Sequence, residues 1–310
     1  MECDVLSSTA DVELVYMDDP AAVPELVPRA DALIVSHYPR FTAAVLRRLP
    51  RARVLVRNGV GFDNVDAEAA RELGIPVCNV PDYGTEEVAD HALTFALALV
   101  RRLHVAVTDV RAGHWFWPVV APLPRIRGLA FGIVGCGRIG TAAALRAKAF
   151  GFRVQFYDPY LASGYEKAIG VARCATLDEL LQSSDVLSLH APLTSQTRGM
   201  LGEREFSQMK RGALLVNTAR GPLVQEQALL VALDSGNLAG AALDVLENEP
   251  RYHPGLLRHP NCLITPHMAF YSEAALVDMR KGAARTALEA LNGSLPRNVV
   301  NGVTRPRSIV

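Results

Sequence analysis

Three polar side chains of different chemistry follow three apolar segments in the second half of the chain. Arg220 comes after the segment 214–217, Glu249 follows 241–243, and His267 follows 263–265. The carboxyl ends of neighbouring parallel strands meet at one edge of a sheet, so these segments would bring a cation, a carboxylate and an imidazole together. Such groups bind anions and transfer protons. Each residue alone is typical of a surface or capping position, but their conjunction indicates a shared ligand crevice.

A glycine pattern typical of dinucleotide-binding proteins precedes these residues. The stretch GIVGCGRIG at 132–140 places Gly135, Gly137 and Gly140 between an apolar run and a helix-like segment. These glycines permit a tight turn, a close approach of the backbone to a pyrophosphate, and close packing of the helix on the strand. The N-terminus of that helix then faces the phosphates. A glycine-rich turn without a ligand is the alternative explanation of the motif.

An acidic residue strengthens the dinucleotide interpretation. Asp158 lies 18 residues after Gly140, at the end of the next apolar run. An acid at this place hydrogen-bonds the adenosine ribose and repels a 2′-phosphate. Pro159 and Tyr160, which follow it, supply no arginine for such a phosphate. The sequence therefore predicts NAD rather than NADP as the cofactor, although a turn or capping role would also explain Asp158.

Short apolar runs alternate with helix-like segments along most of the chain. The runs are rich in Val, Leu and Ile and do not alternate with polar residues, which is typical of parallel strands buried on both faces. We expect strands at 12–16, 33–36, 54–57, 131–134, 154–157, 186–189, 214–217, 241–243 and 263–265, and helices at 142–150, 177–182, 203–209 and 225–234. This alternation predicts an α/β architecture.

One expected helix, at 86–111, carries two apolar stripes at helical spacing. The pattern allows a helix buried inside one subunit, or a helix that packs on its own domain and on a partner chain. The segment Gly113-His114-Trp115-Phe116-Trp117-Pro118 follows, and then a proline-rich stretch. We interpret this part as an aromatic-anchored loop at a domain boundary.

Composition excludes several classes of protein. The 310 residues include 32 basic and 32 acidic side chains, and this formal net charge of zero argues against electrostatic capture of nucleic acid or of an acidic membrane. We find no apolar run of about 18 residues and no secretory signal pattern. Five scattered cysteines without a CxxC pair favour reduced thiols in a cytoplasmic protein with no metal site.

The sequence resembles the D-isomer-specific 2-hydroxyacid dehydrogenase family, in particular the subgroup that includes the C-terminal-binding protein co-repressors. The resemblance covers nearly the whole chain. It rests on VRNGVGFDNVD (56–66), GIPVCNVPDYGTEEVADHAL (74–93), GIVGCGRIG, RAKAFGFRVQFYDPY (146–160), SLHAPLTSQTRGML (188–201), VNTARG, GAALDVLENEP and TPHMAFYSE (265–273).

This resemblance implies two doubly wound parallel-sheet domains. A Rossmann NAD-binding domain at 99–271 is inserted in a smaller flavodoxin-like substrate domain formed by 1–98 and 272–310. The family usually begins with a strand and a helix before the segment aligned with 12–16, so the substrate domain is expected to lack its first strand. The helix at 86–111 resembles the family's dimer helix and implies a homodimer.

The resemblance also implies roles for individual residues. Arg220 binds the substrate carboxylate and polarises the C2 carbonyl, and His267 donates the proton as hydride reaches C2. Glu249 pairs with His267, orients its ring and raises its pKa. Asp244 helps to hold the nicotinamide carboxamide.

The remaining implied site residues belong to the cofactor and the substrate. The cofactor set is Gly135, Gly137, Arg138, Ile139, Gly140, Asp158, His190, Ala191, Pro192, Thr197, Thr218, Ala219 and Asp244. The substrate set is Arg57, Val60, Gly61 and Phe270, with backbone N–H groups of the 57–61 loop facing the substrate carboxylate. Residues 36–40, Tyr83, Trp115 and Trp117 are expected near the substrate side chain.

One motif departs from the family pattern. The usual ARGGLVD reads ARGPLVQ here, and Pro222 removes a backbone N–H beside Arg220 and biases Gly221 toward extended backbone.

The implied activity is the NAD-dependent interconversion of a 2-oxo acid and a D-2-hydroxy acid. The alternatives are an NAD-regulated, co-repressor-like dimeric binding module and a dehydrogenase of an unusual anion such as phosphite. The intact trio favours the enzyme, although the co-repressors keep such a trio too. The sequence does not name the 2-hydroxy acid.

Overall fold

A computed structural model describes residues 2–16 and 28–307 and divides the chain into two compact units. The first unit contains the residues up to Gly84 and those from Ser272 onward, and the second runs from Thr85 to Tyr271. We expected the first crossing near residue 98. The structure instead assigns the whole of helix α5 (Thr85–Val100) to the second unit, because its buried face packs on α7, β8 and β9 of that unit.

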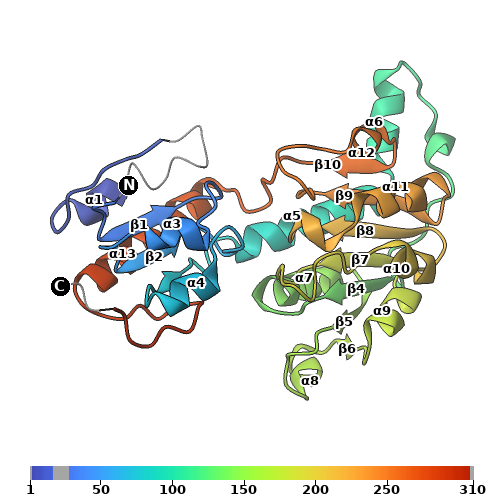
Figure 1. Cartoon of the computed structure of the whole chain (residues 1–310). Helices are drawn as coiled ribbons and strands as arrows, with labels where there is room; N and C mark the ends of the chain where they lie inside the picture. The colour runs from blue at the N-terminus through green and yellow to red at the C-terminus, as the bar shows by residue number, and fades with distance from the viewer. Residues whose placement is uncertain (1, 17–27, 308–310) are drawn as a thin grey trace. The chain divides into compact units, whose positions relative to one another are not determined.

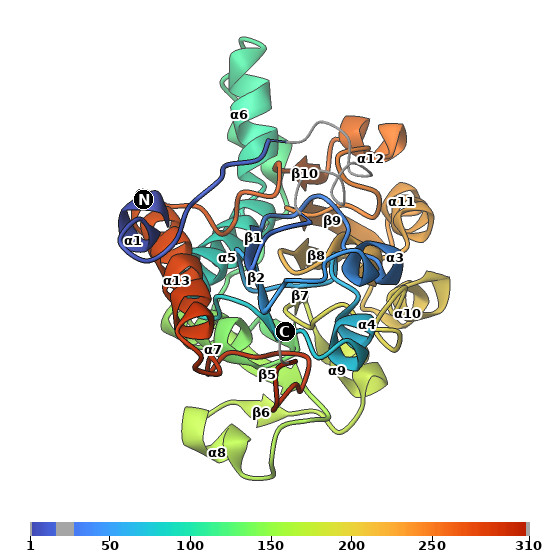
Figure 2. The same ribbon diagram turned by 60° about the vertical axis from the view of Figure 1, so that its left-hand side comes forward.

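The first unit is a three-stranded parallel sheet with helices on both faces. Its strands are β1 (Ala32–Val35), β2 (Val54–Arg57) and β3 (Val77–Cys78), in that order. Helices α3 (Ala43–Arg47) and α4 (Ala67–Glu72) cover one face, and α13 (Glu273–Leu291) covers the other. Helix α1 (Glu2–Leu6) packs on α13, as Figures 1 and 2 show.

The strand predicted at 12–16 does not form. The described residues of this segment are irregular, and Leu14 and Tyr16 are 80% and 92% exposed. No neighbouring strand pairs with them, so their apolar side chains have no sheet face to cover. The sheet of the first unit begins at β1 among the residues that the structure describes.

The second unit contains a seven-stranded parallel sheet with the order β10-β9-β8-β7-β4-β5-β6. The strands are β4 (Ala130–Val134), β5 (Arg153–Tyr157), β6 (Ala172–Arg173), β7 (Val186–Leu189), β8 (Ala213–Asn217), β9 (Leu238–Leu243) and β10 (Cys262–Ile264). The chain builds outward from β4 through β5 to β6, and then returns to the other side of β4 with β7. The direction therefore reverses between β4 and β7, which is where ligands bind in open α/β sheets.

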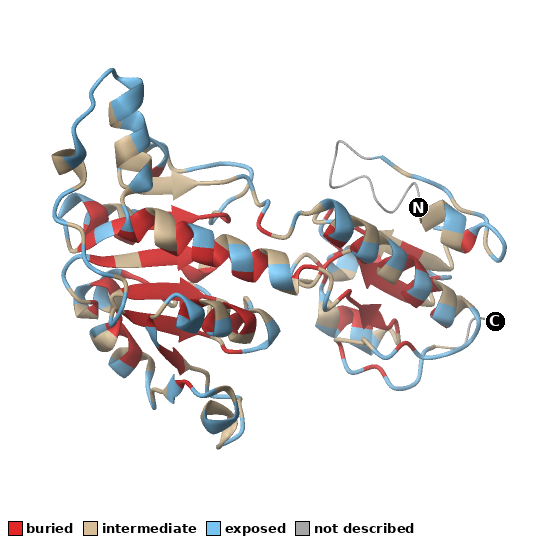
Figure 3. Cartoon of the chain, turned by 180° about the vertical axis from the view of Figure 1, so that it is seen from behind, coloured by how far each residue is buried: buried red, intermediate tan, exposed pale blue. Residues whose placement is uncertain are grey.

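Helices cover both faces of this sheet, and Figure 3 shows buried residues along its central strands and on the helix faces that pack against them. Helices α5 and α7 (Arg138–Ala149) pack on one face, and α9 (Leu177–Ser183), α10 (Glu203–Gln208) and α11 (Glu226–Asp234) pack on the other. Shorter elements complete the unit: α8 (Tyr165–Ile169), α12 (Pro254–Arg258), and two 3₁₀ turns, η1 (Trp117–Val120) and η2 (Gly221–Leu223).

The continuous helix predicted at 86–111 is broken. It forms α5 and a second helix, α6 (Leu103–Arg111), with Arg102 between them at a φ of +47°. A left-handed residue ends the run of helical hydrogen bonds and changes the direction of the chain. Helix α5 buries one face in its own unit, whereas α6 has no buried residue and stands away from the sheet (Figures 1 and 3).

None of the helices in the described part of the chain is long and apolar enough to cross a membrane. All five cysteines are free thiols.

Candidate active site

Two of the three glycines of the motif, Gly135 in the loop after β4 and Gly140 in the first turn of α7, allow no side chain. Gly135 has a φ of +84°, and a Cβ there would lie 2.8 Å from Ala191 Cα. A Cβ at Gly140 would lie 2.1 Å from the carbonyl oxygen of Gly135. A side chain at either position would push the loop and α7 apart from the sheet.

The middle glycine of the loop faces open space. A Cβ at Gly137 would meet no protein atom within 4 Å, and Gly137 is the N-cap of α7. The first N–H groups of the helix, including those of Arg138 and Ile139, have no partners within the helix. Such an end attracts phosphate through its N–H groups and its dipole. This geometry fits the pyrophosphate of a dinucleotide.

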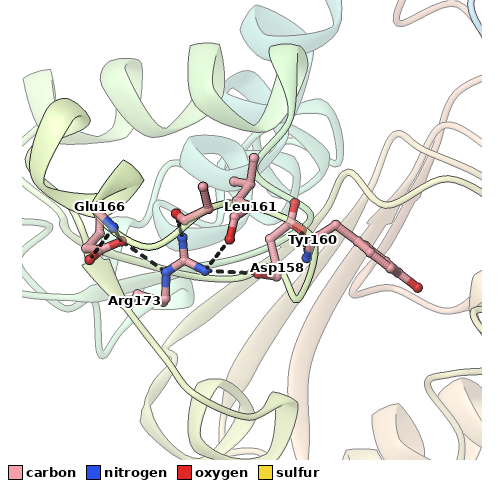
Figure 4. A network of polar contacts seen from close by, with 7 residues as sticks. Asp158, Tyr160, Leu161, Glu166 and Arg173 are labelled. Atoms are coloured by element: carbon pink, nitrogen blue, oxygen red, sulfur yellow. Dashed lines mark hydrogen bonds and ion pairs between the residues drawn. The ribbon is translucent and has the colours of Figure 1, made fainter.

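Asp158 ties the glycine loop to the turn that follows β5. Its Oδ2 accepts a hydrogen bond of 2.9 Å from the Cys136 N–H. Its Oδ1 accepts one of 2.9 Å from the N–H of Tyr160, which lies beside it in Figure 4. A carboxylate has about four acceptor sites, so the ribose hydroxyls can still bind. Burial raises the pKa of the Cys136 thiol to about 11, so the loop carries no thiolate beside the phosphates.

His190 follows β7 directly and lies beside the glycine loop. Its backbone N–H donates a hydrogen bond to Val134 O. Its ring Nε2 lies 2.9 Å from Ser188 Oγ, and its buried Nδ1 has no hydrogen-bond partner among the described residues. Burial lowers the pKa of His190 to about 4, so the ring is neutral near pH 7. Thr197 closes the following loop by donating to Pro192 O at 2.6 Å.

The end of β8 holds Arg220 in a turn built by Asn217. The fully buried Asn217 side chain donates to Arg220 O at 2.9 Å and accepts from the Ala219 N–H at 3.0 Å. A second residue of this turn, Thr218, has a buried hydroxyl without a partner among the described residues, as expected of an atom that meets a ligand. Arg220 Nη1 donates to Ala219 O at 2.7 Å.

The turns that follow β8 and β9 touch at Gly221. A Cβ there would lie 1.8 Å from Leu246 O, so only glycine fits. We expected Pro222 to hold Gly221 in extended backbone, but Gly221 begins the 3₁₀ turn η2. This contact places Arg220 next to the segment that carries Glu249.

Glu249 and His267 form a direct pair, from the segments after β9 and β10. Glu249 Oε2 lies 2.7 Å from His267 Nδ1, and Glu249 Oε1 accepts from the Leu246 N–H at 2.8 Å. Burial raises the pKa of Glu249, but the hydrogen bond and charge of His267, the Leu246 N–H and the charge of Arg220 outweigh it and lower that pKa overall. Glu249 is therefore a carboxylate near pH 7, within electrostatic reach of Arg220.

His267 has an unusual backbone, with a φ of +53°, and Asp244 stabilises it. The His267 N–H donates to Asp244 O at 2.8 Å, and the carboxylate of Asp244 accepts from the N–H groups of Met268 and Ala269 at 2.9 and 2.8 Å. Asp244 is 2% exposed. Asp244, which we expected at the nicotinamide carboxamide, therefore holds the loop that carries His267.

Two further residues extend this network. Thr265 Oγ1 donates to Asp244 Oδ1, and His91 Nε2 of α5 lies 3.2 Å from Thr265 Oγ1. Burial lowers the pKa of His91, and the negative charge of Asp244 opposes that shift. Phe270 packs edge-on against His267, with 6.4 Å between ring centroids.

The substrate residues expected at 57–61 lie in the first unit, after β2. Arg57 is 3% exposed, and its Nη1 donates to Asn58 O at 2.8 Å. Val60 O accepts from the Asn79 side chain at 2.7 Å, and the Val80 N–H donates to Gly59 O at 3.0 Å. Gly61 follows in this braced loop. The N–H groups of Asn58 and Gly59 donate to Val35 O and Arg57 O, so the predicted contacts of a substrate carboxylate are those of Val60 and Gly61.

Comparisons with known proteins agree with this geometry. Residues 93–269 match the sequence model described as D-isomer specific 2-hydroxyacid dehydrogenase, NAD binding domain. The chain is 37% identical over 300 residues to glyoxylate reductase of Thermococcus litoralis, covering 93% of this chain and 90% of that protein. A crystal structure of a glyoxylate reductase from Paecilomyes thermophila superposes with a TM-score of 0.89 at 32% identity, covering 96% of this chain and 94% of that one.

The chain belongs to the D-isomer-specific 2-hydroxyacid dehydrogenase family. This membership confirms the predicted α/β fold class, the NAD cofactor and an NAD-dependent oxidoreductase of 2-oxo and 2-hydroxy acids. The chain is also 36% identical over 297 residues to C-terminal-binding protein 1 of Caenorhabditis elegans, which confirms the predicted kinship with that subgroup. The alignment covers 91% of this chain but only 40% of the length of that relative.

Sequence reasoning missed three residues of this dehydrogenase-family site. From the sequence we assigned no role to Asn217 of the VNTARG motif, although asparagine at a strand end commonly braces the following turn through its side chain. Thr265 and His91 were overlooked because their contact joins residues 174 positions apart, and no local pattern signals it.

No group of three or more metal-ligating side chains that could hold an ion occurs among the described residues.

Proposed function

We propose that this protein reduces a small 2-oxo acid to the D-2-hydroxy acid with NADH. The observation that carries the proposal is the 2.7 Å contact between Glu249 and His267, at the same end of the sheet as the glycine loop and Arg220. When bound, NADH supplies a hydride. The protein must then bind a carboxylate, polarise a carbonyl and deliver one proton to its oxygen.

The residues divide this work by their chemistry. The guanidinium of Arg220 binds the substrate carboxylate and polarises the C2 carbonyl, since its fork matches a planar anion. His267 contacts Glu249 through Nδ1, and its Nε2 atom protonates the C2 oxygen. Phe270, against the His267 ring, keeps water from that face.

A screen of 2-oxo acids with NADH tests this function. The oxidation of NADH is followed by absorbance with glyoxylate, pyruvate, hydroxypyruvate and larger 2-oxo acids, and the configuration of each chiral product is determined. We expect turnover with at least one small 2-oxo acid and a D product. Binding of NADH without oxidation by any 2-oxo acid would favour the NAD-regulated binding module instead, and turnover with phosphite and NAD alone would favour the unusual-anion dehydrogenase.

We also propose that the protein acts as a cytoplasmic homodimer. Leu103, Val107 and Val110 lie at helical spacing on α6 and are 56%, 39% and 49% exposed. Trp115 and Trp117, expected beside the substrate, are 91% and 80% exposed in the same part of the unit. A second copy covering this apolar surface explains why α6 stands away from its own sheet. The five free thiols favour a reducing compartment.

Light scattering during size-exclusion chromatography tests the assembly. We expect a dimer for the native chain and a monomer for Val107→Asp, which places a charge in the middle of the apolar face. Thr108→Asp, on the same helix, is the matched control and should remain dimeric. A monomeric native chain would refute the dimer.

A further inference from the structure

The guanidinium group of Arg173 binds backbone carbonyl groups of the turn between β5 and α8. It lies on the short edge strand β6, opposite Phe156 of β5, and stacks on that ring at 5.0 Å. Its Nη1 donates to Asp158 O at 3.2 Å and to Leu161 O at 3.1 Å, and its Nη2 donates to Ala162 O at 2.8 Å. Figure 4 shows these bonds converging on one side chain.

An acid completes the clamp. Arg173 Nε donates to Glu166 Oε2 at 3.1 Å, and both side chains are 23% exposed. The carboxylate of Glu166 also accepts from the Gly164 N–H at 3.1 and 3.2 Å, so it holds the start of α8 as well. Hydrogen bonds from its own backbone N–H and from Gly164 and Arg173 lower the pKa of Glu166 against the effect of burial. The pair is therefore charged near pH 7.

The clamped turn is the one that orients Asp158. The Asp158 carbonyl oxygen accepts a hydrogen bond from Arg173, while its carboxylate accepts from the N–H groups of Cys136 and Tyr160. A change in the path of 158–162 would therefore rotate the carboxylate away from the ribose. Arg173 itself offers its Nε, Nη1 and Nη2 atoms to this turn and to Glu166, which disfavours a role in binding a phosphate.

We propose that Arg173 is a specificity-positioning residue for the cofactor. It holds the 158–162 turn so that the carboxylate of Asp158 faces the adenosine ribose and repels the 2′-phosphate of NADP. The opposite role, in which the guanidinium binds that phosphate, predicts the opposite change on substitution. The proposal concerns only the cofactor site, so it stands apart from the identity of the 2-oxo acid.

Calorimetric titration with NAD and NADP, without substrate, distinguishes the two roles. For Arg173→Gln we expect NAD to bind about three- to tenfold more weakly and NADP to bind unchanged or more tightly, so that the preference for NAD narrows. Arg173→Lys should reduce the preference for NAD over NADP by a similar factor, because one ammonium group cannot replace the guanidinium fork. Arg204→Gln, which removes an exposed arginine paired with Asp178 and Glu205, is the matched control and should leave the preference unchanged.

A double-substitution cycle tests the route of the effect. Asp158→Ala should narrow the preference, and adding Arg173→Gln to it should change the preference no further, since Arg173 acts through Asp158. If Arg173→Gln fails to fold, Arg173→Lys and Glu166→Gln decide, and Glu166→Gln should give a smaller change of the same sign. Weaker NADP binding with unchanged NAD binding in the Arg173 variants would overturn the proposal, as would an unchanged ratio or additive effects in the cycle.

Discussion

The most informative single change is Glu249→Gln, because the two oxygens of Glu249 accept hydrogen bonds from two different donors. Oε2 faces His267 Nδ1 at 2.7 Å, and Oε1 faces the Leu246 N–H at 2.8 Å. A glutamine has one oxygen and one NH₂ group, so in either orientation a donor faces a donor whenever the His267 ring is protonated. The substitution therefore removes both the charge and one acceptor from the protonated pair.

The expected magnitude follows from the burial of the pair. A hydrogen bond between charged groups contributes about 1.5–3 kcal/mol. The side chains of His267 and Glu249 are 23% and 27% exposed, so we take the lower part of that range. About 1.5–2 kcal/mol corresponds to a loss of about 10- to 30-fold in kcat for 2-oxo acid reduction.

The assay is kcat for reduction of the best 2-oxo acid at one pH, with NADH binding measured in parallel. NADH affinity should stay within about twofold, since Glu249 is assigned to the proton and not to the cofactor. Glu247→Gln is the matched control, because Glu247 lies in the same segment but contacts the Glu226 N–H. A kcat of Glu249→Gln equal to the native value would refute the pairing and leave Glu249 as a structural acid before Pro250.

The same pair predicts how stability depends on pH. The pKa of Glu249 is lowered from its ordinary value of 4.5, so its contribution to stability is fully present above that value and is lost as pH falls through the lower folded pKa. The difference in Tm between the native chain and Glu249→Gln should therefore shrink below about pH 4.5. Differential scanning fluorimetry from pH 7 to pH 3 measures it, and a constant difference would contradict this linkage.

Four further substitutions test the rest of the site. Gly137→Ala meets no protein atom, so it should keep the native Tm while weakening NAD binding at least about tenfold, whereas Gly140→Ala, with its Cβ 2.1 Å from Gly135 O, should lower the Tm itself. Calorimetric binding and thermal melts of the two variants separate these effects, and a native-like Gly140→Ala would contradict them. His267→Ala should lower turnover about 10²–10⁴-fold with NADH binding nearly unchanged, and a loss below tenfold in steady-state kinetics would rule out its role as the acid. Asp158→Ala should narrow the preference of the enzyme for NADH over NADPH in the ratio of kcat/KM values, and equal use of both cofactors by the native chain would show that Asp158 does not select between them.

Much of the architecture was predictable because its signals are local. Eight of the apolar runs became strands of two parallel sheets, since runs of Val, Leu and Ile need burial on both faces. The glycine loop was predictable for a similar reason. Gly135 and Gly140 occupy positions that allow no Cβ, so the sequence itself records the close approach of the backbone.

Two predicted elements were wrong because the local sequence pattern is compatible with more than one tertiary structure. The run at 12–16 has the composition of a strand, but no neighbouring strand pairs with it, and Leu14 and Tyr16 remain exposed. The apolar stripes of 86–111 continue through Arg102, but that residue adopts a left-handed backbone and separates a buried helix from an exposed one. Hydrophobic periodicity reports which side chains avoid water and does not report where a helix ends.

The candidate site divides along the same line. The types of Arg220, Glu249 and His267, and their places after strands, were visible in the sequence, and the family resemblance supplied their roles. The tertiary structure alone showed that Asp244 holds the strained backbone of His267 and that His91, far away in the chain, reaches Asp244 through Thr265. A sequence sets the chemistry of each side chain and the local path of the backbone. The distance between two side chains depends on the order and register of the strands that carry them, and only the folded sheet decides that.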